Sequence, residues 1–184
     1  MSPTQIMELI GQICGVIIIV LSMISTQFPK RWQILLVFAA MNLLSVFNQL
    51  FVGAGYASAL GCGVAAIHCP INSYKAKRAL PTSILENILW SILYFAAWGA
   101  GVYISVRLGT ASWLDVFPLL GTITFLFSVF LPKERDVRIF TFANSLVYCI
   151  YNIINLNVAA VSQVLAMISV VIALIRYREK KNVP

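Results

Sequence analysis

Charged side chains are scarce in this sequence, and acidic ones are the scarcest. Only 10% of the 184 residues are charged, and Asp and Glu together number 6 against 13 Lys and Arg. Hydrophobic residues make up 60% of the chain, and the mean hydropathy is +0.90. A soluble domain of this size cannot bury so much apolar surface, so the composition indicates a membrane protein.

Residues that commonly carry catalysis or bind metals are also few. His68 is the single histidine, and we expect the carboxylates of Glu8, Glu86 and Asp115 to lie at the membrane edge. The four cysteines lack the C-x-x-C spacing of a zinc site or a disulfide framework. No nucleophile beside a base and no phosphate-binding loop is recognisable. We therefore predict no cofactor, no bound metal and no enzymatic activity, and an intramembrane enzyme is the weakest of three functional hypotheses.

Apolar stretches of membrane-spanning length fill the chain. A helix needs about 20 mainly apolar residues to cross the hydrocarbon core of a bilayer. The predicted helices span residues 5–25, 32–52, 56–74, 84–106, 114–131, 137–155 and 158–177. Basic residues at 75–78 are expected to form a loop before the fourth helix. The sequence thus predicts an all-α membrane protein with seven transmembrane helices.

One fixed offset relates the first part of the chain to the last. Ser25, Pro29 and Lys30 recur as Ser128, Pro132 and Lys133, a shift of 103 positions (25 to 128). The same shift carries the basic cluster at 74–78 onto 177–181. A constant offset linking several features is evidence of an internal repeat. We predict a first three-helix repeat at 1–78, a linker helix at 79–112, and a second three-helix repeat with a basic tail at 113–184.

Basic residues gather on one side of the predicted helices. With seven crossings, twelve of the 13 Lys and Arg fall in the first, third and fifth loops and the tail, and only Arg107 lies opposite. The positive-inside rule then places the N-terminus outside and the C-terminus in the cytoplasm. Contact of these loops with anionic lipid headgroups explains the net charge of +7, so no nucleic-acid partner is expected. The two units would face the same way, as parallel repeats in a 3+1+3 arrangement.

Polar side chains follow one face of the second and sixth predicted helices. The stripes are Asn42, Ser45 and Gln49, then Ser145, Tyr148 and Asn152 after the same shift, with Asn144 beside the second stripe. Polar groups are costly in hydrocarbon, so two matching stripes could line a central cavity. The predicted solute-binding residues are Asn42, Ser45, Gln49, His68, Asn144, Tyr148 and Asn152. The alternative is that the stripes form hydrogen bonds between packed helices.

His68 and several prolines are further candidates. His68 could bind the solute or titrate near physiological pH, or it could be a neutral imidazole bonded to a neighbouring helix. Pro70 removes a hydrogen bond within its helix and could create a hinge or only a packed kink. The predicted gate or hinge residues are Ser25, Pro29, Pro70, Ser128 and Pro132. For Pro29 and Pro132 the alternative is ordinary helix termination.

Three stretches resemble a known family. Residues 116–122 (Val-Phe-Pro-Leu-Leu-Gly-Thr), 148–152 and 175–178 (Ile-Arg-Tyr-Arg) resemble the fifth-helix start and the last two helices of the YgjV-like bacterial inner-membrane proteins. The 3+1+3 plan and the proline-basic turns are more distantly similar to the SWEET and PQ-loop transporter superfamily. The resemblance implies a multi-pass protein of the bacterial inner membrane. It does not imply a SWEET-like sugar site, because Ile175 stands at the position that corresponds to Asn72.

The repeats, the polar stripes and this resemblance together predict a transporter. It would move a small neutral or zwitterionic polar solute, such as a sugar, an amino acid or a vitamin-like compound, by alternating access. The alternative is a non-transporting membrane adaptor or structural protein without a solute pathway. The expected partners are the lipid bilayer and the solute, and the sequence leaves a homo-oligomer open.

Overall fold

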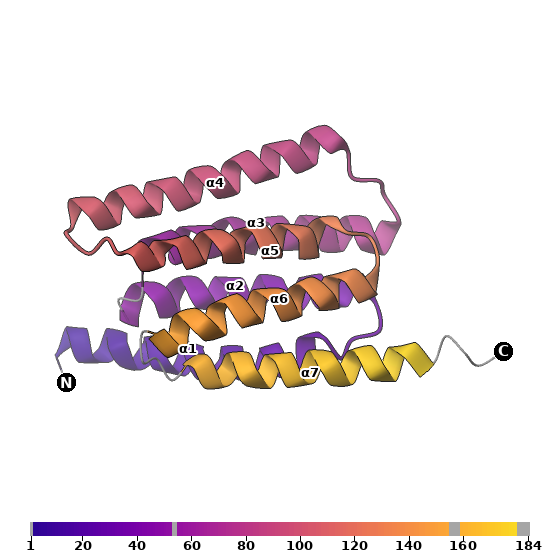
Figure 1. Ribbon diagram of the computed structural model, residues 1–184, viewed down its shortest axis with the longest axis horizontal. Coiled ribbons are helices and arrows are strands. Elements are labelled where there is room, and N and C mark those ends of the chain that lie inside the picture. The colour runs from indigo at the N-terminus through magenta and orange to yellow at the C-terminus, as the bar shows by residue number, and fades with distance from the viewer. Residues whose placement is uncertain (1, 53–54, 155–158, 180–184) are drawn as a thin grey trace.

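The structure is a computed structural model that describes residues 2–52, 55–154 and 159–179. Within these ranges the chain forms seven α-helices and one short 3-10 helix, which run side by side along one long axis (Figure 1). In order they are α1 (Pro3–Ser25), α2 (Arg31–Val52), α3 (Tyr56–Arg78), α4 (Ile84–Arg107), η1 (Trp113–Asp115), α5 (Val116–Phe130), α6 (Glu134–Ile154) and α7 (Ala159–Glu179). The all-α prediction is confirmed for this part of the chain. The turn residues 53–54, the helix-end residues 155 and 158 and the tail residues Lys180 and Lys181 lie outside it.

Helix starts follow the capping residues of the sequence. Ser2 accepts a hydrogen bond from the Gln5 backbone N–H, and the Gln5 side chain accepts one from the Ser2 N–H, which is a capping box at the start of α1. Ser83 accepts a hydrogen bond from the Glu86 N–H at the start of α4. These bonds satisfy donors that the first helical turn otherwise leaves unpaired.

The end of α3 corrects one prediction. Residues 75–78 are not a loop but the last turn of α3, which runs through Pro70 without interruption and ends where Ala79 adopts a left-handed conformation with φ of 53°. Lysine and arginine are good helix formers, and their charge is favourable at a helix C-terminus. Lys75 also forms an ion pair with Glu86 at the start of α4. The turn from α3 to α4 is therefore tied by a charged contact between the two helices.

Six helical segments of the described chain are long and apolar enough to cross a membrane, and α3 does not meet this criterion. It contains 23 residues, like α1, but it carries three basic residues in its last turn. His68, Asn72 and Ser73 of α3 are buried in the protein interior. These polar side chains of α3 therefore contact other helices and not lipid.

Contacts between helices close a ring. Along the chain α1 packs on α2, α2 on α3, α5 on α6 and α6 on α7, while α1 also meets α7 and α3 meets α5. Helix α4 lies outside this ring and packs mainly on α3 (Figure 1). Helices α1, α3, α5 and α7 end at the same end of the bundle, which we call the basic end because it carries Lys30, Lys75, Lys133 and Arg176.

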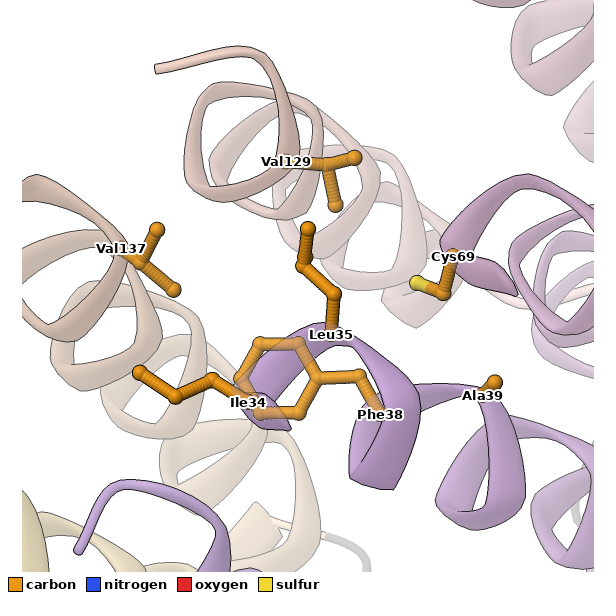
Figure 2. Close-up of a cluster of buried hydrophobic side chains, with 7 residues drawn as sticks. All are labelled: Ile34, Leu35, Phe38, Ala39, Cys69, Val129 and Val137. Carbon is orange, nitrogen blue, oxygen red and sulfur yellow. The ribbon is translucent and has the colours of Figure 1, made fainter. Parts of the chain in front are cut away.

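An apolar cluster fills the ring near the basic end. Its buried members are Ile34, Leu35, Phe38 and Ala39 of α2, Cys69 of α3, Val129 of α5 and Val137 of α6. In Figure 2 Leu35 extends toward Val129 and Ile34 toward Val137, so side chains of α2 meet those of the second half of the chain. We call this cluster the apolar plug.

Candidate functional site

A cavity of about 580 Å³ lies inside the ring of helices. All six ring helices line it, and Tyr94 adds a contribution from α4. Pockets that bind small molecules typically have volumes of about 300–1,000 Å³. The cavity is therefore large enough for a solute of that class.

The apolar plug separates the cavity from the basic end. Phe38 belongs to the plug and also lines the cavity. Ile34 and Leu35, one turn nearer the basic end, belong to the plug and do not line the cavity. On α6, Thr141 lines the cavity, and Val137, one turn nearer the basic end, lies in the plug. Away from the plug, the lining extends along α1 as far as Gln12, whose side chain is exposed. The end of the cavity at the plug is its closed end.

Both predicted polar stripes face this cavity. The lining residues include Asn42, Ser45 and Gln49 of α2, Asn144, Ser145, Tyr148 and Asn152 of α6, and the two predicted gate serines, Ser25 and Ser128. The stripes lie on helices that the chain separates by about a hundred residues, and the fold brings them to opposite sides of one space. Solute binding by these residues stays a prediction.

Ser25 and Ser128 have the same local geometry. The Ser25 hydroxyl donates to the Ser22 carbonyl oxygen at 3.0 Å, and the Ser128 hydroxyl donates to the Phe125 carbonyl oxygen at 2.7 Å. Both serines are 1% exposed, and their positions differ by 103 (25 to 128). The other gate candidates differ, because Pro29, Pro70 and Pro132 are exposed and none of them lines the cavity.

His68 also lies outside the cavity lining. Its ring stacks on Trp90 with the centroids 4.2 Å apart, and its Nδ1 atom lies 3.3 Å from the Tyr94 hydroxyl oxygen. Phe130 packs edge-on against the same imidazole. Of these neighbours, Tyr94 lines the cavity. His68 is thus bonded to a neighbouring helix and reaches the cavity only through Tyr94.

Several lining residues were not among the predicted set. They are Gln12 and Ser22 of α1, Asn48 of α2, Ser58 of α3, Tyr94 of α4, Thr122 of α5, and Ser162 and Gln163 of α7. An amide inside an apolar run was the available signal for Gln12, Asn48 and Gln163. No comparable signal marked Tyr94, because a tyrosine in a membrane helix is as often a packing residue.

Hydrogen bonds divide the lining amides into two kinds. Asn144 donates to the Gly121 carbonyl oxygen at 2.7 Å and to Thr124 Oγ1 at 3.1 Å, so it joins α6 to α5. Asn42 donates to the Phe38 carbonyl oxygen of its own helix. The Gln49 Oε1 atom is buried and has no hydrogen-bond partner in the protein. The side-chain amides of Asn42 and Gln49 therefore form no hydrogen bond to another helix of the described chain.

The lining combines apolar side chains with polar ones that carry no charge. Among the described residues that form it there is no lysine, arginine, histidine, aspartate or glutamate. Elsewhere in the described ranges, no group of three His, Cys, Asp or Glu side chains lies together in a way that could hold a metal ion. The side chains of the lining can form hydrogen bonds and aromatic contacts with a ligand.

Comparison with known proteins gives one match. The sequence model of the Imp-YgjV family, described as bacterial inner membrane protein, matches residues 9–181. No match was found among curated proteins. None was found among solved structures.

Proposed function

Because the chain belongs to the Imp-YgjV family of bacterial inner membrane proteins, we propose that it moves a small polar solute across that membrane by alternating access. The solute is neutral or zwitterionic. The observation that carries the proposal is the cavity of about 580 Å³, lined by uncharged polar side chains and closed at one end by an apolar plug. Asn42 and Asn144 contact the solute, and Gln49 and Asn152 line the cavity farther from the apolar plug.

Two parallel three-helix units with α4 as the linker are part of this proposal. The helices of the two units can be paired as α1 with α5, α2 with α6 and α3 with α7. When the members of each pair are exchanged, every observed helix–helix contact within the ring becomes another observed contact. The pair α1–α2 becomes α5–α6, α2–α3 becomes α6–α7, and α1–α7 becomes α5–α3. Such exchange is expected of two like-facing repeats related by a two-fold axis along the membrane normal.

Seven crossings complete the arrangement, with α3 as the span that hydropathy misses. Its 23 residues span about 34 Å at 1.5 Å per residue, enough for the hydrocarbon core. With seven crossings the basic end faces the cytoplasm and the N-terminus lies outside. The present conformation is then closed toward the cytoplasm, and transport requires the apolar plug to open.

Flux through purified protein in liposomes tests the proposal. Vesicles are challenged with a panel of labelled sugars, amino acids and vitamins, with and without a proton gradient. We expect at least one solute to exchange faster than in protein-free vesicles, and Asn42→Leu to reduce that exchange while the protein stays folded. Leu43→Ile, a change at an exposed neighbouring position, serves as the matched control.

Two results would contradict transport. The first is an absence of protein-dependent flux for every solute under every gradient. The second is an Asn42→Leu protein that loses its fold instead of its activity, since this would assign the stripe to packing. That result would favour the adaptor hypothesis.

A further inference from the structure

The closed end of the cavity offers hydrogen-bond acceptors more than donors, beginning with its hydroxyl groups. Four lining hydroxyls lie within hydrogen-bond distance of carbonyl oxygens in their own helices: Ser22 to Ile19 at 2.7 Å, Ser25 to Ser22 at 3.0 Å, Ser128 to Phe125 at 2.7 Å and Thr141 to Val137 at 2.7 Å. A carbonyl oxygen cannot donate, so each hydroxyl must use its single proton in this bond. Only lone pairs remain for a solute.

The lining amides show the same bias. Asn42 and Asn48 each direct one amide N–H at a backbone carbonyl oxygen 2.8 Å away, that of Phe38 and that of Gly11. Asn144 directs its amide nitrogen at two acceptors, so both of its protons are engaged. The atom beside a carbonyl oxygen must be the nitrogen, because an oxygen there would be repelled. Asn144 therefore offers a solute only its carbonyl oxygen, whereas Asn42 and Asn48 each offer a carbonyl oxygen, with two lone pairs, and one remaining N–H.

Gln49 adds an independent observation. Gln49 lines the cavity, and its Oε1 atom is buried and has no hydrogen-bond partner among the described residues. A buried acceptor without a partner costs about 1–3 kcal/mol, so such groups are normally satisfied. A rotation of the Gln49 side chain that turns this oxygen toward the cavity would let a donor on a bound solute satisfy it.

On the basis of the proposed transport function, we propose that the transported solutes are those rich in O–H or N–H donors, namely polyols and, beyond the neutral and zwitterionic class proposed above, cationic amines, and that organic acids are excluded. Carboxylate or phosphate oxygens would face acceptor lone pairs and would meet no cationic side chain in the described lining. Phe38, Phe125 and Tyr94 line the same end of the cavity. Their rings can pack against C–H groups of a polyol or hold an ammonium group by cation–π contact.

Matched pairs of solutes test this donor requirement in proteoliposomes. The probes are mannitol with its fully O-methylated ether, 1,4-diaminobutane with its bis(trimethylammonium) derivative, which has no N–H group, and succinate. Methylation removes donors and keeps the carbon skeleton. We expect the donor-bearing member of a transported pair to leave preloaded vesicles at least about tenfold faster than its methylated partner. This factor corresponds to the loss of one to two hydrogen bonds by the methylated solute. Succinate should leave at the rate seen in protein-free vesicles. The mannitol and diamine arms separate hydroxyl donors from ammonium donors.

Ser128→Ala locates the requirement in the closed end. Removing this acceptor should lower the preference for the donor-bearing member by about two- to tenfold, the worth of one hydrogen bond. Ser91→Ala is the matched control, because Ser91 also donates to a carbonyl oxygen of its own helix, that of Asn87, but does not line the cavity. It should leave the preference unchanged.

The possible failures are distinguishable. Succinate or a methylated solute that moves as fast as a donor-bearing solute overturns the donor requirement and leaves transport intact. If the transported solute is instead another member of the panel of sugars, amino acids and vitamins, its own donors are methylated. The flux of that solute is then compared with the flux of its methylated form. An absence of protein-dependent flux for every solute instead contradicts the proposed function itself.

Discussion

At the scale of single residues, Gln49 separates a binding role from a packing role. Its buried Oε1 atom has no partner, so folding gains nothing from it. Replacing a buried unsatisfied group by an apolar one of similar shape is close to neutral or stabilising. We predict that Gln49→Leu leaves the thermal midpoint unchanged or raises it, while solute flux falls. Thermal unfolding in detergent and liposome flux measure the two effects.

The neighbouring residue Asn48 supplies the matched control. It donates to the Gly11 carbonyl oxygen at 2.8 Å and so joins α2 to α1. Asn48→Leu removes this hydrogen bond between the two helices, worth about 0.5–1.5 kcal/mol, so its thermal midpoint should fall. A Gln49→Leu protein that is as unstable as Asn48→Leu would show that the Gln49 amide supports the fold.

Residue spacing predicted the cavity lining better than it predicted the gate. Asn42, Ser45 and Gln49 fall on one helical face by periodicity alone, and they do line the cavity. His68 could not be placed in this way, because its burial depends on Trp90 and Tyr94, which belong to another helix. A pattern along one helix shows which residues share a face but not what the face meets.

At the scale of helices, side chains of the second half of the chain bind the C-cap residue of α1 and the turn that follows it. The last carbonyl groups of a helix have no partner within it. Here Arg138 of α6 donates to the Thr26 carbonyl oxygen at 3.0 Å and to that of Phe28 at 2.8 Å, and the Tyr177 hydroxyl donates to the Gln27 carbonyl oxygen at 2.6 Å. The Arg138 guanidinium also stacks on the Tyr177 ring at 4.3 Å. These contacts hold the two halves together at the basic end.

Ser169 of α7 extends this capping. Its hydroxyl donates to the Met23 carbonyl oxygen, and the Gln27 amide donates to the Ser169 carbonyl oxygen at 2.8 Å. When such a contact opens to water, its polar groups become hydrated, so the net cost of each bond is only about 0.5–1.5 kcal/mol. A polar seam of this kind can open and close repeatedly, as alternating access requires.

Arg138→Ala tests the importance of the seam. The change leaves two buried carbonyl groups unpaired and should destabilise the protein by on the order of 2–5 kcal/mol, with a lower thermal midpoint. Arg135, an exposed arginine in the same helix, is the matched control, and Arg135→Ala should be neutral. Equal midpoints for the two variants would show that the capping contacts contribute little to closure.

Helix α4 is fixed to α3 along its length, which predicts that the two move together. Besides the Lys75–Glu86 pair, Gly101 of α4 comes so close to α3 that a Cβ atom would lie 2.2 Å from the Ala57 Cα atom. Gly101→Ala should therefore force α4 away from α3 and lower the thermal midpoint. A Cβ at Gly99 meets nothing within 4 Å, so Gly99→Ala is the control and should be tolerated. A stable Gly101→Ala protein would contradict this close packing.

Helix bounds were largely predictable because they follow from local chemistry. Hydropathy, proline and capping serines mark the ends of most helices within a few residues. The length of α3 was underestimated because three basic residues were taken for a loop, although they pack and pair at a helix end. The capping of α1 by Arg138 could not be predicted, since it joins groups that are 110 or more positions apart.

At the scale of the whole molecule, two sets of side chains surround the cavity. Uncharged polar groups line it between the halves, and the apolar plug closes it on the side of the basic end. The offset of 103 residues predicted that the halves would be alike (25 to 128). It could not predict the plug, whose members Leu35, Cys69 and Val129 look like any other apolar residues in a membrane helix.

Two cysteines of α3 allow the sidedness of this arrangement to be measured. Cys62 lines the cavity, whereas Cys69, about two turns nearer the basic end, belongs to the apolar plug and is 0% exposed. A charged, membrane-impermeant thiol reagent needs an aqueous path to its target. In a protein whose other cysteines are replaced by alanine, Cys62 should react when the reagent is added from the periplasmic side, and much more slowly from the cytoplasmic side.

Cys69 as the single cysteine is the matched control and should resist the reagent from both sides while the plug is closed. Opening of the plug should reverse the pattern, so Arg138→Ala should raise the reactivity of both thiols from the cytoplasmic side. Reaction of Cys62 only from the cytoplasm would place the basic end in the periplasm and contradict the proposed orientation. Equal reaction of both thiols from one side would mean that the apolar plug does not exclude water, and alternating access would then need a different barrier.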